Sequence, residues 1–207
     1  MVMIATLLTF SLAAILLTLT PGLDTALILR TSIAEGRKNG FKAALGINAG
    51  CYIWGTIVAL GLGALLAASQ VAYDCLKWIG AAYLLWLAIQ LILARPQPLT
   101  IASASQQPKT TNWFLRGCLG NVLNPKIGIF YVSFLPQFIP AGQSPVIWTF
   151  LLVSIHVAIG TLWSTVLINI AAKASGYLQQ PKIIQWMNRV TAGVFVLFAA
   201  KLAFSSR

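Results

Sequence analysis

Long apolar segments alternate with short polar segments along the whole chain. An α-helix needs about 20 apolar residues to cross the hydrocarbon core of a bilayer. The pattern predicts about six such helices, at residues 4–29, 43–68, 73–94, 113–139, 144–172 and 183–204. We therefore expect an all-α integral membrane protein with a single transmembrane domain over residues 1–207.

The composition agrees with a membrane protein. Residues of the hydrophobic class make up 58% of the chain and charged residues only 8%, whereas soluble domains carry roughly 25% charged residues. A net charge of +11 would suggest nucleic acid in a soluble protein. Here the basic residues lie between apolar segments, where they orient the chain and meet anionic headgroups. We expect contact with the lipid bilayer and no nucleic-acid partner.

Several other classes are disfavoured by what the chain lacks. The first apolar segment has no basic leader or clear cleavage site, so we expect a retained span. The cysteines, Cys51, Cys75 and Cys118, are far apart and argue against a disulfide framework, a redox pair or a zinc site. One histidine and three acidic residues do not suggest a metal site. No nucleophile–base pair indicates an enzyme, and no cofactor is expected.

The most polar stretch, residues 95–112, predicts a cytoplasmic loop between two halves, 1–94 and 113–207. With three spans in each half, the second half must cross the membrane in the opposite sense to the first. We expect the first and fourth helices to be broken at proline, which is the pattern of transporters with inverted repeats. The predicted architecture is thus a 3+3 inverted repeat.

The distribution of Lys and Arg predicts the orientation, because basic residues accumulate on the cytoplasmic side. One set of connections carries Arg30, Arg37, Lys38, Lys42, Arg95, Lys109, Arg116, Lys173, Lys182 and Arg189. The other set carries Lys77, Lys201 and Arg207. We therefore expect both termini to lie outside the cytoplasm.

The first predicted break joins a proline, a glycine and a carboxylate. Pro21 lacks a backbone N–H, Gly22 relaxes the backbone, and Asp24 follows within the same apolar span. Freed backbone groups at membrane depth must face protein or water, so the break fits a cavity lining. Asp24 can bind a substrate ammonium group or exchange a proton. Alternatively, it only caps the helix that restarts after Pro21.

The second predicted break carries a cation. Asn124 precedes Pro125 and is pushed away from helical geometry, and Lys126 follows within an apolar span. Intramembrane charges are costly and usually functional. Lys126 can pair with Asp24, bind a substrate carboxylate, or extend its side chain to the cytoplasmic interface.

Two further polar residues are candidates for the same site. Asn48 lies among small residues of the second span, where a hydrogen bond between packed helices is favoured over substrate contact. His156, in the fifth span, can relay protons, although a buried neutral histidine bonded to a neighbour is the simpler interpretation.

Four segments, in this order, resemble the lysine-exporter (LysE/RhtB) family of amino-acid translocators. They are Thr20-Pro21-Gly22-Leu23-Asp24, the glycine-spaced stretch from Gly36 to Gly50, Lys77-Trp78-Ile79-Gly80-Ala81-Ala82-Tyr83-Leu84, and Asn124-Pro125-Lys126 followed by Phe134-Leu135-Pro136-Gln137-Phe138. The resemblance covers essentially the whole chain. One departure is Leu23, which stands where the family's signature has a second proline.

The resemblance implies export of amino acids from the bacterial cytoplasm across the inner membrane, coupled to proton entry. The pattern is closer to the homoserine, threonine and leucine branch than to the basic amino-acid branch. The expected mechanism is alternating access of the two halves around a site at the two breaks. Alternatives are export of another small metabolite or a cation, and a non-transporting membrane protein. A homo-oligomer is a further possibility.

Overall fold

The computed structural model describes residues 2–68, 70–93, 111–140, 142–171 and 180–204, and within these ranges every regular element is helical. The first part contains α1 (Val2–Leu19), α2 (Leu23–Ala34), α3 (Arg37–Ala68) and α4 (Gln70–Leu93). The second part contains α5 (Trp113–Val122), α6 (Pro125–Ile129), the π-helical turn η1 (Phe130–Phe134), the 3₁₀ turn η2 (Leu135–Phe138), α7 (Pro145–Asn169) and α9 (Pro181–Phe204).

The expectation of an all-α membrane protein is confirmed for the described residues. By length and hydropathy, α3 over Arg37–Gly61 and α7 can each cross a membrane, and α1 with α2 can form a third span. The count of six spans stays a prediction. Most of the predicted loop at 95–112 lies outside the described residues.

Between the predicted spans at 4–29 and 43–68, the polar and basic residues 30–42 predict a loop, and this prediction is wrong. Helix α2 continues to Ala34 and α3 begins at Arg37, so only Glu35 and Gly36 separate them. Arginine and lysine are good helix formers and remain solvated at a membrane interface, so the basic residues here do not end a helix. Gly36 makes the turn instead, because its φ of 83° lies in the left-handed region that glycine adopts without strain.

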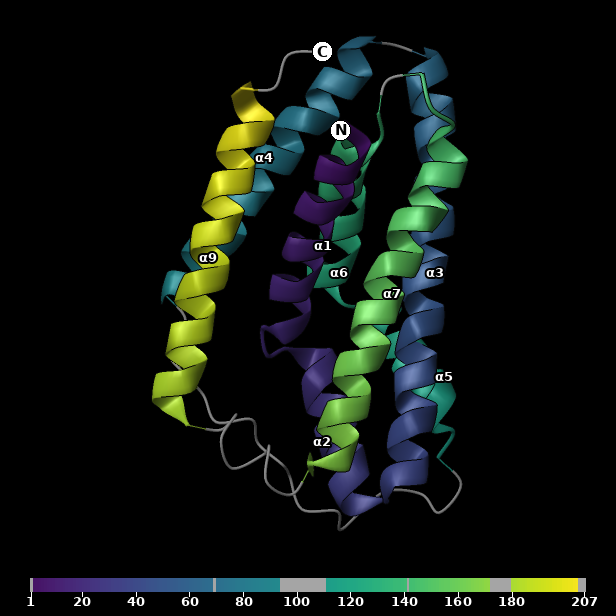
Figure 1. Ribbon diagram of the computed structural model, residues 1–207, viewed down its shortest axis with the longest axis vertical. Coiled ribbons are helices and arrows are strands. Elements are labelled where there is room, and N and C mark those ends of the chain that lie inside the picture. Colours follow the sequence, from purple (N-terminus) through teal and green to yellow (C-terminus); the bar gives the residue numbers. More distant parts are fainter. Residues whose placement is uncertain (1, 69, 94–110, 141, 172–179, 205–207) are drawn as a thin grey trace.

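The helices form a bundle in which segments distant in sequence lie side by side (Figure 1). Helix α3 packs against both α5 and α7, and α4 packs against α9. The start of α1 and the end of α9 lie at the same end of the molecule, and α2, α5 and the start of α3 lie toward the opposite end (Figure 1). Helix α1 is central, and its buried Phe10 contacts the rings of Phe130 and Phe138.

Glycines allow the closest of these helix contacts. A Cβ atom at Gly46 of α3 would lie 2.0 Å from the Phe114 carbonyl oxygen, and one at Gly117 of α5 would lie 2.1 Å from the Ala43 carbonyl oxygen. Only glycine permits backbones to approach so closely, which is a common basis of helix association in membranes. This contact fixes the position of α5 along the axis of α3. It therefore also fixes the position of the residues that follow α5.

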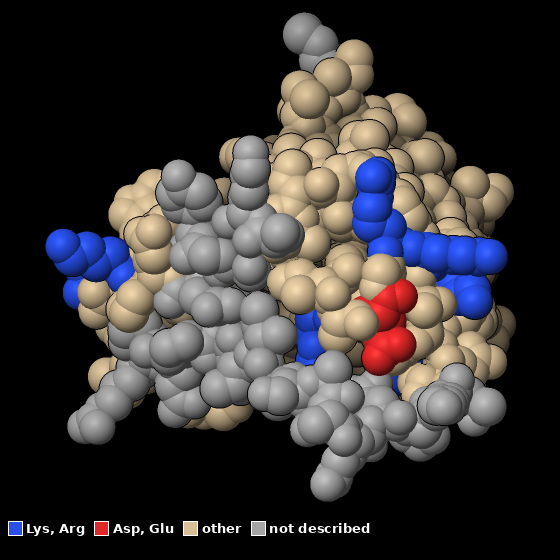
Figure 2. Space-filling view, turned by 90° about the horizontal axis from the view of Figure 1, so that it is seen from below, with Lys and Arg blue, Asp and Glu red and all other residues tan. Residues whose placement is uncertain are grey.

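The end of the molecule near α2 and the start of α3 is basic. Figure 2 shows Lys and Arg side chains spread around this end, with acidic side chains close to some of them. Arg37 here donates a hydrogen bond to the side chain of Asn169, which joins the start of α3 to the end of α7. The basic side chains of Arg30, Arg37, Lys38, Lys42 and Arg116 belong to α2, α3 and α5.

Candidate functional site

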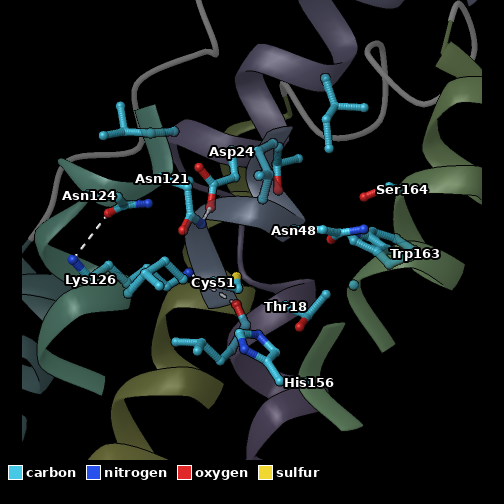
Figure 3. Close-up of a pocket in the computed structure, with 18 of the residues that line it drawn as sticks. Thr18, Asp24, Asn48, Cys51, Asn121, Asn124, Lys126, His156, Trp163 and Ser164 are labelled. Carbon is cyan, nitrogen blue, oxygen red and sulfur yellow. Dashed lines mark hydrogen bonds between the residues drawn. The ribbon is translucent and has the colours of Figure 1, made fainter. Parts of the chain in front are cut away.

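A cavity of about 70 Å³, enough for several water molecules, lies where the two interrupted helices meet α3 and α7. Figure 3 shows its lining side chains arriving from α1, α2, α3, α5, α6 and α7. Its polar lining residues are Thr18, Thr20, Asp24, Thr25, Asn48, Asn121, Asn124, Lys126, His156, Trp163 and Ser164. The cavity therefore combines polar groups with an apolar lining that includes Leu17, Ile47 and Ile127.

The first interruption lies between α1 and α2, whose axes differ in direction by 52°. Gly22 occupies the N-cap position of α2 in an extended conformation, and no side chain bonds the first turn. Leu23, Asp24 and Thr25 of that turn all line the cavity. The first N–H groups of a helix have no partner within the helix, so this turn beside the cavity has backbone donors that no side-chain cap occupies.

The second interruption lies between α5 and α6, at Leu123 and Asn124. Asn124 is the N-cap of α6, and its Oδ1 accepts a 3.1 Å hydrogen bond from the Lys126 N–H. Pro125 fills the first helical position, where a missing N–H does no harm. This interruption is thus closed by its own side chains, unlike the first.

The two interruptions contact one another reciprocally. The Lys126 Nζ donates 3.1 Å hydrogen bonds to the carbonyl oxygens of Leu17 and Thr20, at the end of α1. Conversely, Asn121 Nδ2, in the last turn of α5, donates a 2.9 Å hydrogen bond to Asp24 Oδ2. In each case, the second residue of the restarting helix binds the end of the helix that precedes the other interruption.

These contacts differ from two of the alternatives that the sequence left open. Lys126 does not extend to the interface, since its Nζ is held by the two α1 carbonyls. The Asp24 carboxylate is bonded by Asn121 rather than paired with Lys126. The N-cap of α2 is Gly22, so Asp24 stands two positions further along the chain than the capping residue, inside the helix.

The remaining predicted polar residues have protein partners. His156 is buried, and its Nδ1 is hydrogen-bonded to the Tyr131 hydroxyl at 2.9 Å. Asn48 Nδ2 donates to Thr161 Oγ1 at 2.9 Å, which links α3 to α7. Both residues also line the cavity. Each therefore bonds a neighbouring side chain and lies at the site at the same time.

Three polar atoms of the lining are buried without a hydrogen-bond partner. They are Thr18 Oγ1, Asn121 Oδ1 and Trp163 Nε1. Native proteins satisfy nearly all buried polar groups. Other buried polar atoms without a partner lie away from the cavity, at Thr31, Ser32, Trp54 and Thr149. The three atoms at the cavity are those that water or a ligand inside it could bond.

The structure brings most of the sequence candidates to this cavity. Gly22, Asp24, Asn48, Asn124, Lys126 and His156 line it, whereas Pro21 and Pro125 do not. Three further lining residues, Asn121, Trp163 and Ser164, are not among the site candidates named from the sequence. Asn121 had a usable signal, because it is a polar residue in an apolar span, three positions before Asn124. Trp163 and Ser164 follow His156 at helical spacing, but Trp is common in packed spans.

The chemistry of the lining fits binding rather than bond making. Among the residues that the structure describes, no group of three or more His, Cys, Asp or Glu side chains gathers as a metal ion would require. The cavity instead offers one carboxylate, one ammonium group and several amides and hydroxyls. A polar cavity between interrupted helices is the usual arrangement of a membrane transport protein.

Comparison with known proteins identifies the family. The LysE type translocator family matches residues 15–206. The chain therefore belongs to the LysE family of translocators, which makes it a transporter rather than an enzyme.

Relatives of similar length match along nearly the whole chain. The homoserine/homoserine lactone efflux protein of Salmonella typhi is 30% identical over 94% of this chain and 94% of its own. The leucine efflux protein of an Enterobacter species is 29% identical over 94% of this chain and 93% of its own. An uncharacterised membrane protein of Vibrio cholerae is 32% identical over 91% of this chain and 92% of its own. No solved structure matches the chain.

Proposed function

We propose that the protein is a secondary transporter that exports small neutral amino acids from the bacterial cytoplasm across the inner membrane, in exchange for protons. The observation that carries the proposal is the cavity, in which Asp24 and Lys126 are the charged lining residues. An amino-acid zwitterion carries one charge of each sign. It is therefore a ligand whose charges this cavity can match.

The ammonium group of the substrate binds at Asp24 and Asn121. One carboxylate oxygen of Asp24 already accepts a hydrogen bond from Asn121, which holds the side chain in place. The fully buried Asn121 leaves its Oδ1 without a partner. A substrate ammonium group has three N–H donors, so it can use both the carboxylate and the free amide oxygen.

The carboxylate of the substrate binds at the first turn of α2. A helix N-terminus carries partial positive charge and free N–H donors, which suit a carboxylate. Lys126 strengthens this end electrostatically, because a Cβ at Gly22 would lie only 3.7 Å from the Lys126 Nζ. The same lysine thus closes the end of α1 and adds positive charge beside the start of α2.

The two halves, residues 1–94 and 113–207, form a 3+3 inverted repeat with proline-induced breaks in its first and fourth spans. The reciprocal contacts of Asp24 and Lys126 support this symmetry, since each half supplies the equivalent residue to the other. The packing of α3 on α7 and of α4 on α9 supports it too, because these pairs would be equivalent helices. The basic end shown in Figure 2 would face the cytoplasm, because basic residues accumulate on that side, and both termini would then lie outside.

Proton exchange follows from the position of Asp24. It is the acidic residue among those that line the cavity. Protonation of Asp24 from the outside would neutralise the carboxylate and release the substrate ammonium group. Return of the empty carrier to the cytoplasmic side, followed by loss of the proton, would complete the exchange by alternating access.

The experiment is transport in proteoliposomes that contain the purified protein. Vesicles loaded with radiolabelled homoserine, threonine or leucine should release label faster than protein-free vesicles, and an imposed proton gradient should accelerate the release. Release at the protein-free rate for every amino acid tested would contradict the proposal. Release at the same rate with and without the proton gradient would contradict proton exchange but not amino-acid export.

A further inference from the structure

The α7 side of the cavity is polar, although it lies away from the charged residues. Trp163 and Ser164 of α7 and Asn48 of α3 line this side. Figure 3 shows them across the cavity from Asn124 and Lys126. A substrate whose charged groups bind at Asp24 and Lys126 would therefore direct another part of itself toward α7.

The indole N–H of Trp163 is a hydrogen-bond donor without a partner. Its Nε1 is buried and has no partner. An indole N–H can only donate, and buried donors left unpaired are rare in native proteins. The atom that completes this bond must be an acceptor, such as a hydroxyl or carbonyl oxygen.

The lack of a charged residue beside Trp163 among the described lining residues limits which substrate side chains can bind there. Figure 3 shows Lys126 across the cavity from Trp163, and Asp24 between the two rather than beside Trp163. A charged substrate side chain directed at Trp163 would enter an apolar bundle without a counter-charge, which is costly. An uncharged side chain with an oxygen acceptor satisfies both conditions.

We propose that Trp163 and Ser164 form a subsite for the oxygen of an uncharged polar side chain and thereby set substrate preference. The inference rests on the function proposed above, because it assumes that an amino acid occupies the cavity. Trp163 donates its N–H to the substrate oxygen. Ser164, which is buried on the same wall, contributes a hydroxyl that can donate or accept.

Two isosteric amino acids test the subsite. Homoserine and norvaline differ only by a terminal hydroxyl in place of a methyl group. The wild-type protein in proteoliposomes should transport homoserine with the higher kcat/KM. Replacing Trp163 by Phe (W163F) removes the N–H, so the homoserine-to-norvaline ratio should fall about three- to tenfold, as expected for one neutral hydrogen bond.

The chain supplies a matched control. Trp54 Nε1 is also buried without a partner, but Trp54 is not among the lining residues and packs against Gly128. W54F should leave the substrate ratio unchanged. S164A should lower the ratio in the same direction as W163F and serves as the test if W163F does not fold.

The outcomes separate this inference from the proposed function. Transport of both amino acids with the same ratio in the wild type, W163F and S164A would overturn the subsite alone. An equal fall of the ratio in W54F and W163F would also overturn it. No transport of any amino acid by the folded wild-type protein would contradict the proposed function, and the subsite with it.

Discussion

The two helix interruptions differ in how their backbone groups are satisfied. At the second, Asn124 caps α6 with its side chain and Pro125 occupies the position that needs no N–H. At the first, the N-cap is Gly22, and no side chain bonds the start of α2. The second interruption thus has a side-chain cap of its own, while the first, which borders the cavity, has none.

The carbonyl groups at the end of α1 are hydrogen-bonded by a residue of the second interruption. Lys126 bonds the carbonyl oxygens of Leu17 and Thr20, so the second interruption supports the first. This difference suggests that the two interruptions have different roles. Under the proposed function, the α5–α6 interruption supports α1, and the α1–α2 interruption receives the substrate.

Removal of the supporting lysine should have the largest effect on stability. In K126M, the carbonyls of Leu17 and Thr20 lose their donor, and both residues are almost fully buried. Each unsatisfied buried group costs about 1–3 kcal/mol, so we expect a loss of about 2–4 kcal/mol. Thermal unfolding of the detergent-solubilised protein measures it.

The control for K126M is K42M, which removes an exposed lysine of α3. K42M should unfold within a degree or so of the wild type, because exposed charges contribute little. Equal unfolding temperatures for K126M and K42M would contradict the role of Lys126 as the support of α1.

Removal of the cap at the second interruption should have an intermediate effect. N124A loses the side-chain cap of α6, which typically costs about 1 kcal/mol. Asn112 caps α5 in the same way, by accepting a hydrogen bond from the Leu115 N–H. N124A and N112A should therefore lose similar stability. Only N124A should slow transport, because α6 carries Lys126.

Thermal unfolding and initial transport rates measure these two effects separately. Slower transport in N112A, to the same degree as in N124A, would mean that the α5–α6 interruption has no special part in the site.

Closing the first interruption should have the smallest effect on stability. In G22S, the hydroxyl can accept an N–H of the first turn of α2, which should stabilise the protein by a few tenths of a kcal/mol. The same bond would occupy a donor meant for the substrate carboxylate. We therefore expect homoserine binding to weaken severalfold, as measured by isothermal titration calorimetry.

G22A is the control for this substitution, because it adds a methyl group but no acceptor. A Cβ at Gly22 meets Lys126 at an ordinary contact distance of 3.7 Å. If G22A weakened binding as much as G22S, the open donors of α2 would not be the carboxylate site.

The positions of the helices could be predicted from the sequence because apolar length is a local property. The loop predicted at residues 30–42 failed because polar composition was taken for irregular structure, whereas only Gly36 has the conformation of a turn. The charged candidates Asp24 and Lys126 could be found too, since charge in an apolar span is rare.

The partners of those charges could not be predicted. Asp24 bonds Asn121, which is 97 residues away, and this contact depends on the height at which α5 packs against α3. That height is set by the close approach at Gly46 and Gly117. Likewise, nothing in the local sequence around Trp163 distinguishes an indole N–H left unpaired at a cavity from one in a packed core.

The central claim is that Asp24, at the first interruption, binds the substrate ammonium group. Its most direct test is the affinity for homoserine of wild-type and D24N protein, measured by calorimetry, with thermal unfolding of each without ligand. A lost charge-assisted hydrogen bond contributes about 1.5–3 kcal/mol, so D24N should bind about 10- to 100-fold more weakly while unfolding near the wild-type temperature. Equal affinity of the two folded proteins would contradict the claim.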